Sequence, residues 1–443
     1  MKVTTSYKVK IVGYNNIFNG TLDVYRSALA YLIEVVKVEW ENVTEFHGVK
    51  DRTMFVERLT HSTSIRDAKY DFDTHFYKMP VYLRRAATAD AISKTSSYRS
   101  NYENWENNGK HGKPPQLQLN HRSFPALFRD NMYIRNSDYT ARIKIYHQND
   151  WGWLTVNLRK SDVDYIMRHK SHLHESVPTL ERKGKNWYLR FAFEETVILT
   201  NKSDVITAVD LGINNAATCS AMLPDGTIIG RRIINFPIEQ DQILHKLNKI
   251  KKAQQNGANG TPRLWAYANN INRSLSEKTA QEIILFATQY GSDIIVFEHL
   301  DLQGKKRGSK KQRLHLWRKK AVINIVTTKA HLLGLRISTV NPWNTSRLAY
   351  DGSGMVERGK YMQDGEEKYN YSICVFPNGK QYHCDLNASY NIGARYYIRE
   401  ILKSLPVTER LAVEAKVPQL AKRITCTLAD LINLNAELKR LAA

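Results

Sequence analysis

Apolar residues alternate with polar ones at the start of the chain, and the period then changes. Tyr7, Val9 and Ile11 occupy every second position, which predicts a strand over residues 6–12. From residue 21 apolar positions recur at intervals of three and four, as on an amphipathic helix. Helical, polar and aromatic sequence continues to about residue 107, where NNGKHGKPPQ predicts a loop or a boundary because of its glycines and prolines.

The next stretch returns to a period of two. Residues 141–146 and 153–158 alternate on either side of a turn at Asn149-Asp150, and residues 178–194 have the pattern of a hairpin that turns near Lys183-Gly184. The order of these patterns predicts a β-barrel-like domain that begins with one strand, is interrupted by helices and then resumes. From Asp204 onward, strands and helices alternate instead, as in an α/β domain. The fold class we predict is therefore multidomain α+β.

Composition and charge narrow the class of partner. The 443 residues include 65 Lys and Arg against 43 Asp and Glu, a net charge of +22, for which a phosphate backbone is the usual partner. A basic surface without a specific partner is the alternative. We expect no membrane partner, since no apolar run is long enough to cross a bilayer and the start has no secretory signal. Four cysteines without a CxxC pair favour a reducing cytoplasm and argue against a disulfide framework.

Two segments combine basic residues with flat aromatic rings, a composition suited to single strands with stackable bases. One lies in residues 84–113. The other, residues 304–320, holds nine basic residues, no acid and one tryptophan. The candidate nucleic-acid contacts are Arg84, Arg85, Tyr98, Arg99, Tyr102, Trp105, Lys110, Lys113, Lys305, Lys306, Arg307, Lys310, Lys311, Arg313, Trp317, Arg318, Lys319 and Lys320.

Three acidic residues stand in unusual places. Asp210 ends the apolar strand 205–209, Glu298 ends the apolar strand 294–297, and Asp385 begins a helix. A bare carboxylate at the end of a buried strand is costly unless a cation offsets its charge. Mg²⁺ prefers oxygen ligands, and two such ions can activate a water and stabilise the leaving oxygen of a phosphodiester. Taken singly, each acid could instead cap a loop or a helix.

These acids and their surroundings resemble the split RuvC-like nuclease domain, of RNase H fold, in transposon-encoded TnpB proteins and in compact type V CRISPR-associated effectors. The matching segments are AVDLGINNAA around Asp210, IIVFEHL around Glu298 and DLNASYNIGA from Asp385. Residues 315–346 also resemble the family's helix and strand that lead to its TS turn. Arg347, just after that turn, is a candidate for contact with the scissile phosphate.

The resemblance implies a domain order. It predicts a wedge domain of β-barrel type (1–20 and 115–200) with an inserted helical recognition domain (21–114). A RuvC-like nuclease domain follows in two parts, 201–342, with a helical insertion at about 238–290, and 385–400. Between these parts lies a target-loading insert (343–384), and a helical tail (401–443) ends the chain.

The chain departs from the family in one respect. Family members commonly carry a four-cysteine zinc ribbon in the insert, and the corresponding positions here are Ala349, Gly352, Val375 and Asn378. We therefore expect the insert to fold without zinc or to be partly ordered.

The resemblance also implies an activity. Relatives are RNA-guided DNA endonucleases that hold a structured RNA, read a motif flanking the target, and cut the non-target strand and then the target strand. We expect Asp210, Glu298 and Asp385 to hold two Mg²⁺ ions, with guide RNA and double-stranded DNA as partners and one or two copies of the chain on each RNA. Two alternatives remain open here: an RNA-guided DNA binder with little cleavage, and a transposase of the same fold that acts without a guide.

Overall fold

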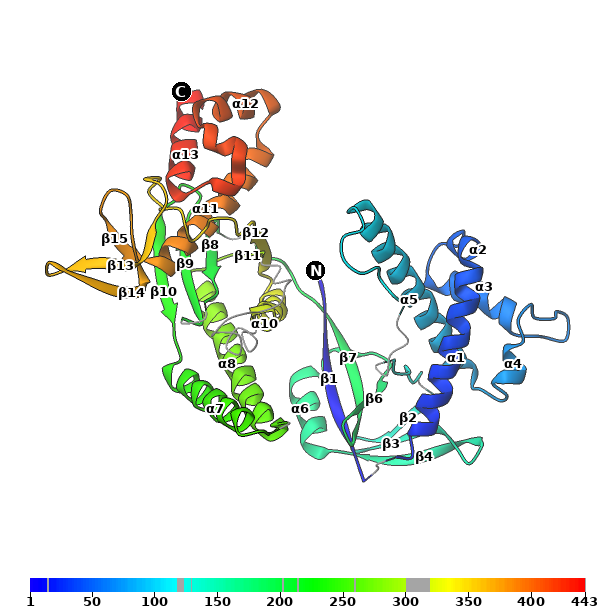
Figure 1. Cartoon of the computed structure of the whole chain (residues 1–443). Helices are drawn as coiled ribbons and strands as arrows, with labels where there is room; N and C mark the ends of the chain where they lie inside the picture. The colour runs from blue at the N-terminus through cyan, green and yellow to red at the C-terminus, as the bar shows by residue number, and fades with distance from the viewer. Residues whose placement is uncertain are drawn as a thin grey trace. The chain divides into compact units, whose positions relative to one another are not determined.

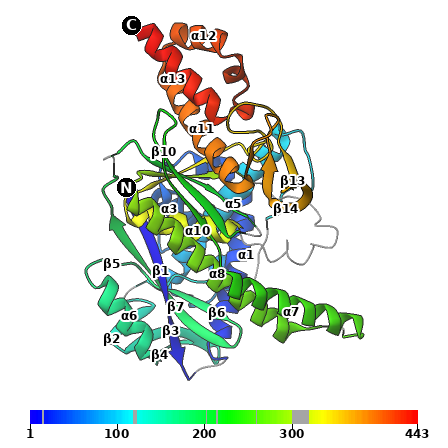
Figure 2. The same cartoon turned by 90° about the vertical axis from the view of Figure 1, so that its left-hand side faces the viewer.

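The computed structural model describes residues 1–13, 16–117, 123–128, 130–200, 203–212, 215–258, 260–299 and 319–442. It divides into two compact units, one of residues 2–195 and one of residues 196–443 together with Met1 (Figures 1 and 2). Both units mix helices with sheets, which confirms the predicted α+β class. Of the predicted basic segment, residues 305–318 lie outside the described residues. No helix in the described ranges is both long enough and apolar enough to cross a membrane.

The unit of residues 2–195 begins with a strand, continues with helices and returns to strands. Its elements are β1 (Lys2–Val12), α1 (Asn19–Val38), α2 (Trp40–Thr44), α3 (Val49–Thr60), α4 (Phe72–His75), α5 (Val81–Asn107), β2 (Tyr133–Ser137), β3 (Thr140–His147), β4 (Asp150–Leu158), α6 (Lys160–Lys170), β5 (His174–Glu175), β6 (Thr179–Lys183) and β7 (Asn186–Thr196).

The strands of this unit form a seven-stranded sheet of order β2-β3-β4-β1-β7-β5, with β6 paired to β7. The strand β1 therefore lies between β4 and β7, although five helices separate it from β2 along the chain. One apolar core joins the sheet to the helices: Ile11 of β1 and Phe191 of β7 share it with Leu29 of α1 and Leu83 of α5. The helices thus fold as part of the same unit as the strands that flank them.

The unit of residues 196–443 holds two sheets and its own helices. Its elements are β8 (Ile206–Asp210), β9 (Ala217–Met222), β10 (Ile228–Ile234), α7 (Pro237–Gln255), α8 (Pro262–Gln289), β11 (Ile294–Glu298), α10 (Lys319–Leu332), β12 (Arg336–Val340), β13 (Glu357–Gln363), β14 (Glu366–Val375), β15 (Gln381–His383), α11 (Cys384–Ser404), α12 (Val407–Lys416), a 3₁₀ segment (Pro418–Thr425) and α13 (Leu428–Ala442).

A five-stranded sheet of order β10-β9-β8-β11-β12 forms the centre of this unit. Strand β11 runs parallel to β8 and to β12, whereas β9 runs antiparallel to β8 and β10. Helices cover both faces of the sheet. Val209 and Phe297 share a core with α8 and α10 on one face, and Ala208 and Val296 share a core with α11 and the C-terminal helices on the other. The side-chain alternation of the strands decides which residues meet which helix.

Candidate active site

The first two candidate acids lie side by side at one edge of the central sheet. Asp210 is the last residue of β8 and Glu298 the last of β11, and the parallel register pairs the residues before them, Val209 with Phe297. Neighbouring strands lie about 4.8 Å apart. Ala208 and Val296 face α11, so the acids two residues further on occupy that same face.

Helix α11 brings the third acid to this edge. Asp385 lies in its first turn, and the His383 ring caps the helix by accepting a hydrogen bond from the Asp385 amide at 3.2 Å. Gly393 lets the helix approach the sheet closely: a Cβ there would lie 2.7 Å from the Met222 side chain and 3.3 Å from Cβ of Ala208. The glycine in the NIGA segment therefore permits the close packing of α11 against β8 and β9.

Protein groups already contact two of the three carboxylates. The Asn215 side chain donates a hydrogen bond to Asp385 at 2.8 Å. Glu298, which is 7% exposed, accepts a hydrogen bond from the Thr345 hydroxyl, and its other oxygen lies 3.6 Å from the ammonium of Lys319. Sequence reasoning assigned no role to Asn215 or Thr345, although both lie in segments that carry the family resemblance.

The electrostatics of the cluster favour a bound cation. Burial, followed by repulsion from Glu298 and Asp385, raises the pKa of Asp210 well above its usual value. Among the described residues, no three His, Cys, Asp or Glu side chains form a group able to hold a metal ion. Glu298 is contacted by Lys319 and Thr345, and Asp385 by Asn215. The all-oxygen donor set itself suits Mg²⁺.

A buried polar stripe on α11 fixes the turn that carries Thr345. Asn387, Asn391 and Arg395 follow one another at intervals of four, so they share one face of the helix. The Asn391 amide donates to the carbonyl of Thr345 at 3.0 Å, and Asn387 binds the backbone of Leu348. The helix that supplies Asp385 therefore also holds the loop that orients Glu298.

The insert beside the site has a small apolar core of its own. Strands β13, β14 and β15 form a three-stranded sheet, and Ala349, Cys374, Phe376 and Cys384 are buried together against it. Asn378, at one of the four positions that the resemblance aligns with zinc ligands, donates a hydrogen bond to Asp351 at 3.0 Å. Side-chain packing and this hydrogen bond join the segments of the insert.

We predict that replacing Phe376 with alanine lowers the free energy of unfolding by about 3–4 kcal/mol, because it empties the centre of this small core. A zinc-selective chelator should leave the melting temperature of the unmodified protein unchanged. Thermal unfolding followed by circular dichroism measures both effects. The matched control is Tyr369→Ala, because Tyr369 lies in the same sheet and is exposed. A chelator-induced fall in melting temperature that zinc reverses would show that the insert depends on the metal.

The other candidate contacts occupy varied environments. Arg84 is 5% exposed and lies 3.4 Å from Asp73 and 3.6 Å from Glu57. Its positive charge is therefore paired with carboxylates inside its own unit and is not presented on the surface. Arg85 is exposed and pairs with Glu57. Lys319 is buried, as described above, whereas Lys320, Lys113 and Arg347 are exposed.

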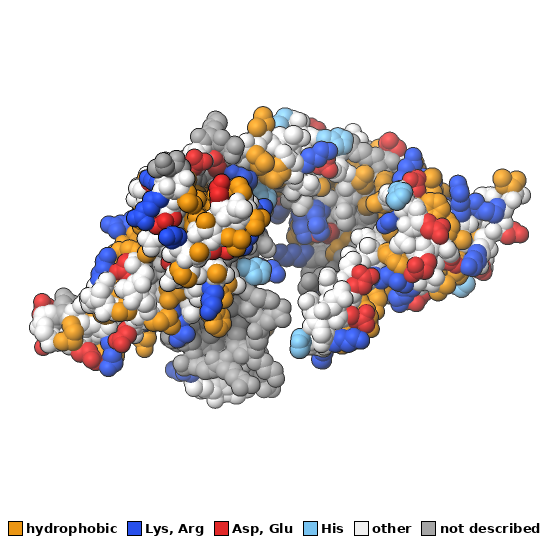
Figure 3. All heavy atoms as spheres, turned by 90° about the horizontal axis from the view of Figure 1, so that it is seen from above, with side chains coloured by type: hydrophobic (Ala, Val, Ile, Leu, Met, Phe, Trp, Pro, Cys, Tyr) orange, Lys and Arg blue, Asp and Glu red, His pale blue; other side chains and the backbone are white. Residues whose placement is uncertain are grey.

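Tyr98, Tyr102 and Trp105 form a ladder along α5. Their spacing of four and three places them on one helix face, with ring centroids 5.9 Å and 5.4 Å apart. Cations flank this ladder: the ammonium of Lys110 lies 5.7 Å from the Trp105 ring, and the Arg99 guanidinium lies over Trp40. On the face seen in Figure 3, Lys and Arg side chains are interspersed with acidic and hydrophobic ones.

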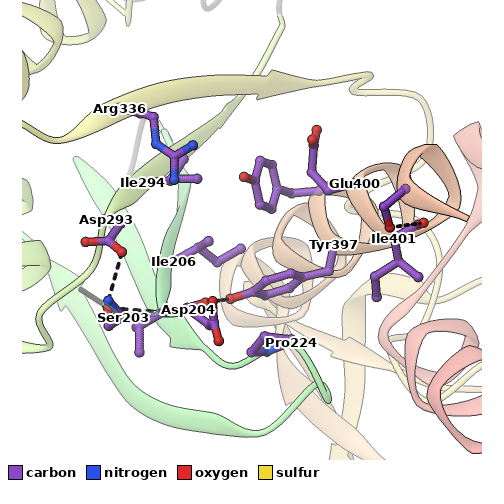
Figure 4. A pocket seen from close by; sticks show the side chains of 13 residues that line it. Ser203, Asp204, Ile206, Pro224, Asp293, Ile294, Arg336, Tyr397, Glu400 and Ile401 are labelled. Carbon is purple, nitrogen blue, oxygen red and sulfur yellow. Dashed lines mark hydrogen bonds between the residues drawn. The ribbon is translucent and has the colours of Figure 1, made fainter. Parts of the chain in front are cut away.

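A hollow of about 280 Å³ opens at the opposite edge of the central sheet. Its polar groups are bound to one another: Asp293 accepts a hydrogen bond from the Ser203 amide at 2.9 Å, and the Tyr397 hydroxyl donates to the carbonyl of Asp204 (Figure 4). These contacts tie the start of β8 to α11. The hollow lies at the amino ends of β8 and β11, away from the three acids.

Known proteins resemble this chain in sequence and in fold. The profile of a family described as the Aq_aa04 family matches residues 4–147. A TnpB-like protein of Aquifex aeolicus, aq_aa05, is 25% identical over 239 residues, which cover 48% of this chain and 74% of that protein. Among solved structures, the Cas12f1–sgRNA–target DNA complex contains a chain of similar fold, with a TM-score of 0.51 and 15% identity over 85% of this chain and 81% of that one.

Proposed function

We propose that this protein is an RNA-guided DNA endonuclease with one metal-dependent site formed by Asp210, Glu298 and Asp385. The observation that carries the proposal is the convergence of these acids on one face and one edge of the central sheet. The relatives agree with it, since one is named TnpB-like and the other was solved with a guide RNA and target DNA. The net charge of +22 suits a partner with a phosphate backbone.

The three carboxylates are the residues that would hold Mg²⁺. When bound, such ions neutralise developing charge and make a nucleophile from water at neutral pH. Asp210 lies beside Glu298 in the sheet and is repelled by both other acids, so a bound cation would relieve that repulsion. Thr345 and Asn215 hold the other two carboxylates in place. These residues orient the ligands, and Arg347, exposed after the turn, is our candidate for contact with the scissile phosphate.

Base pairing would supply the sequence specificity. In such a system the protein contacts the sugar–phosphate backbone of the guide–target duplex, and it reads only a short motif that flanks the target. We assign the motif to the unit of residues 2–195 and the stacking of bases to the ladder on α5. The single site would cut the non-target strand first and the target strand afterwards.

We expect RNA to co-purify with the protein at moderate salt and to confer Mg²⁺-dependent cleavage on DNA that matches its guide segment. Sequencing the bound RNA identifies that segment, and a matched duplex with a scrambled duplex as control tests cleavage. A matched target that is bound but stays uncut would favour the RNA-guided binder. Activity on particular DNA ends without any RNA would favour the transposase.

A further inference from the structure

A buried lysine lies among the candidate metal ligands. Lys319 is the first described residue of α10, and its side chain is 4% exposed. Its ammonium lies 3.6 Å from one oxygen of Glu298, whose side chain is 9% exposed. Removing an ammonium and a carboxylate from water is costly unless each compensates the other. The pair therefore offsets part of the cost of burying both charges.

The lysine serves more than one acid. Asp210, next to Glu298 in the sheet, also attracts the ammonium. The second Glu298 oxygen is bound by Thr345, so both oxygens of this carboxylate have protein partners. A positive charge of the chain thus stands beside Glu298 and Asp210, where it offsets part of the repulsion between the acids.

We propose that Lys319 is the built-in counter-cation of the metal-free site, and that its ammonium must leave Glu298 before a divalent ion can bind there. The inference rests on the proposed function, because it takes the acids as metal ligands. Lys319 is on this view a positioning residue: it keeps the carboxylates gathered, and it competes with the ion for them. Lys319 is buried, whereas its neighbour Lys320 is exposed and remains a candidate for contact with nucleic acid.

Metal affinity tests the inference directly. In the purified full-length protein, titration calorimetry with Mn²⁺ should show about 10-fold tighter binding to Lys319→Met than to the unmodified protein, within the range of coupling between competing groups. Lys319→Arg, which keeps the charge, should bind the ion no more tightly than the unmodified protein. The matched control is Lys329→Met, which removes one charge from the same helix at a lysine bonded to Gln281; it should change the affinity less than twofold.

The melting temperature without metal gives an independent reading. Lys319→Met leaves Glu298 without its cation, so this variant should melt lower than the unmodified protein in chelator and gain more from added Mn²⁺. If Lys319→Met does not fold, Lys319→Gln, which keeps a hydrogen-bond donor, replaces it in both measurements.

Equal Mn²⁺ affinity in the unmodified protein and in Lys319→Met would overturn the counter-cation role while leaving the metal site intact. A different result would overturn the proposed function itself: no Mn²⁺ binding by any form of the protein, together with DNA cleavage that survives Asp210→Ala. The two failures are therefore distinguishable within one set of titrations and cleavage assays.

Discussion

Replacing Asp210 with alanine should lower Mg²⁺-dependent DNA cleavage by about 1000-fold or more, equivalent to about 4 kcal/mol of activation free energy. The reason is that Asp210 ends the strand next to that of Glu298 and is repelled by both other acids, so its loss would remove one of the three carboxylates proposed to hold the metal. Binding of RNA should change little, because the substitution removes a negative charge from a site that repels phosphate. Single-turnover cleavage and filter binding measure the two properties.

The segment just before β8 provides the control for this variant. Asp204 precedes β8 at the opposite edge of the sheet and is exposed. Asp204→Ala makes the identical chemical change, and we expect it to cleave at the normal rate. Undiminished cleavage by Asp210→Ala would sink the assignment of the site, whereas loss of RNA binding would show that the variant has damaged the fold.

Replacing Arg395 with methionine should lower the free energy of unfolding by about 3–4 kcal/mol. The guanidinium is 4% exposed and donates to three carbonyls, those of Cys426 at 2.9 Å, Asn341 at 3.0 Å and Trp343 at 2.7 Å. Burial lowers its pKa to about 10, so it stays charged at neutral pH. Methionine fills a similar volume but leaves those carbonyls unsatisfied.

Chemical denaturation measures this loss, and Arg410→Met is the matched control. Arg410 is partly exposed, with 41% of its side chain accessible, and forms a helical ion pair with Glu414, so its replacement should cost less than about 0.5 kcal/mol. Because Arg395 holds the turn that carries Thr345, the Arg395 variant should also lose cleavage at temperatures where it remains folded. A stable variant with full activity would show that the turn is fixed by other contacts.

The spacing of apolar residues in the sequence was sufficient to predict most of the secondary structure. The apolar spacing after residue 21 marks α1, and the strand-end positions of Asp210 and Glu298 follow from the apolar runs before them. Local periodicity works here because it reflects which side of an element is buried. The family resemblance then supplied the grouping of the three acids, which no local pattern contains.

Other features depend on contacts between distant segments. The charge pattern grouped Arg84 and Lys319 with exposed cations, yet both side chains are buried against carboxylates from other elements. Charge runs in a sequence do not say which members point inward, because that is decided by the packing of the helix that carries them. The hydrogen bonds of Thr345 and Asn215 to the acids likewise join residues 47 and 170 positions apart.

By itself, then, the sequence determined the α+β class, the main elements and the excess of positive charge, and it suggested the three acids as a site. The tertiary structure alone decided that Asp210 and Glu298 end adjacent parallel strands, that Lys319 pairs with Glu298, and that the insert has an apolar core of its own. The physical reason is the separation along the chain of the residues that interact. Backbone periodicity and composition are local, whereas burial, pairing of charges and the approach of α11 to the sheet are set by segments that meet only after folding.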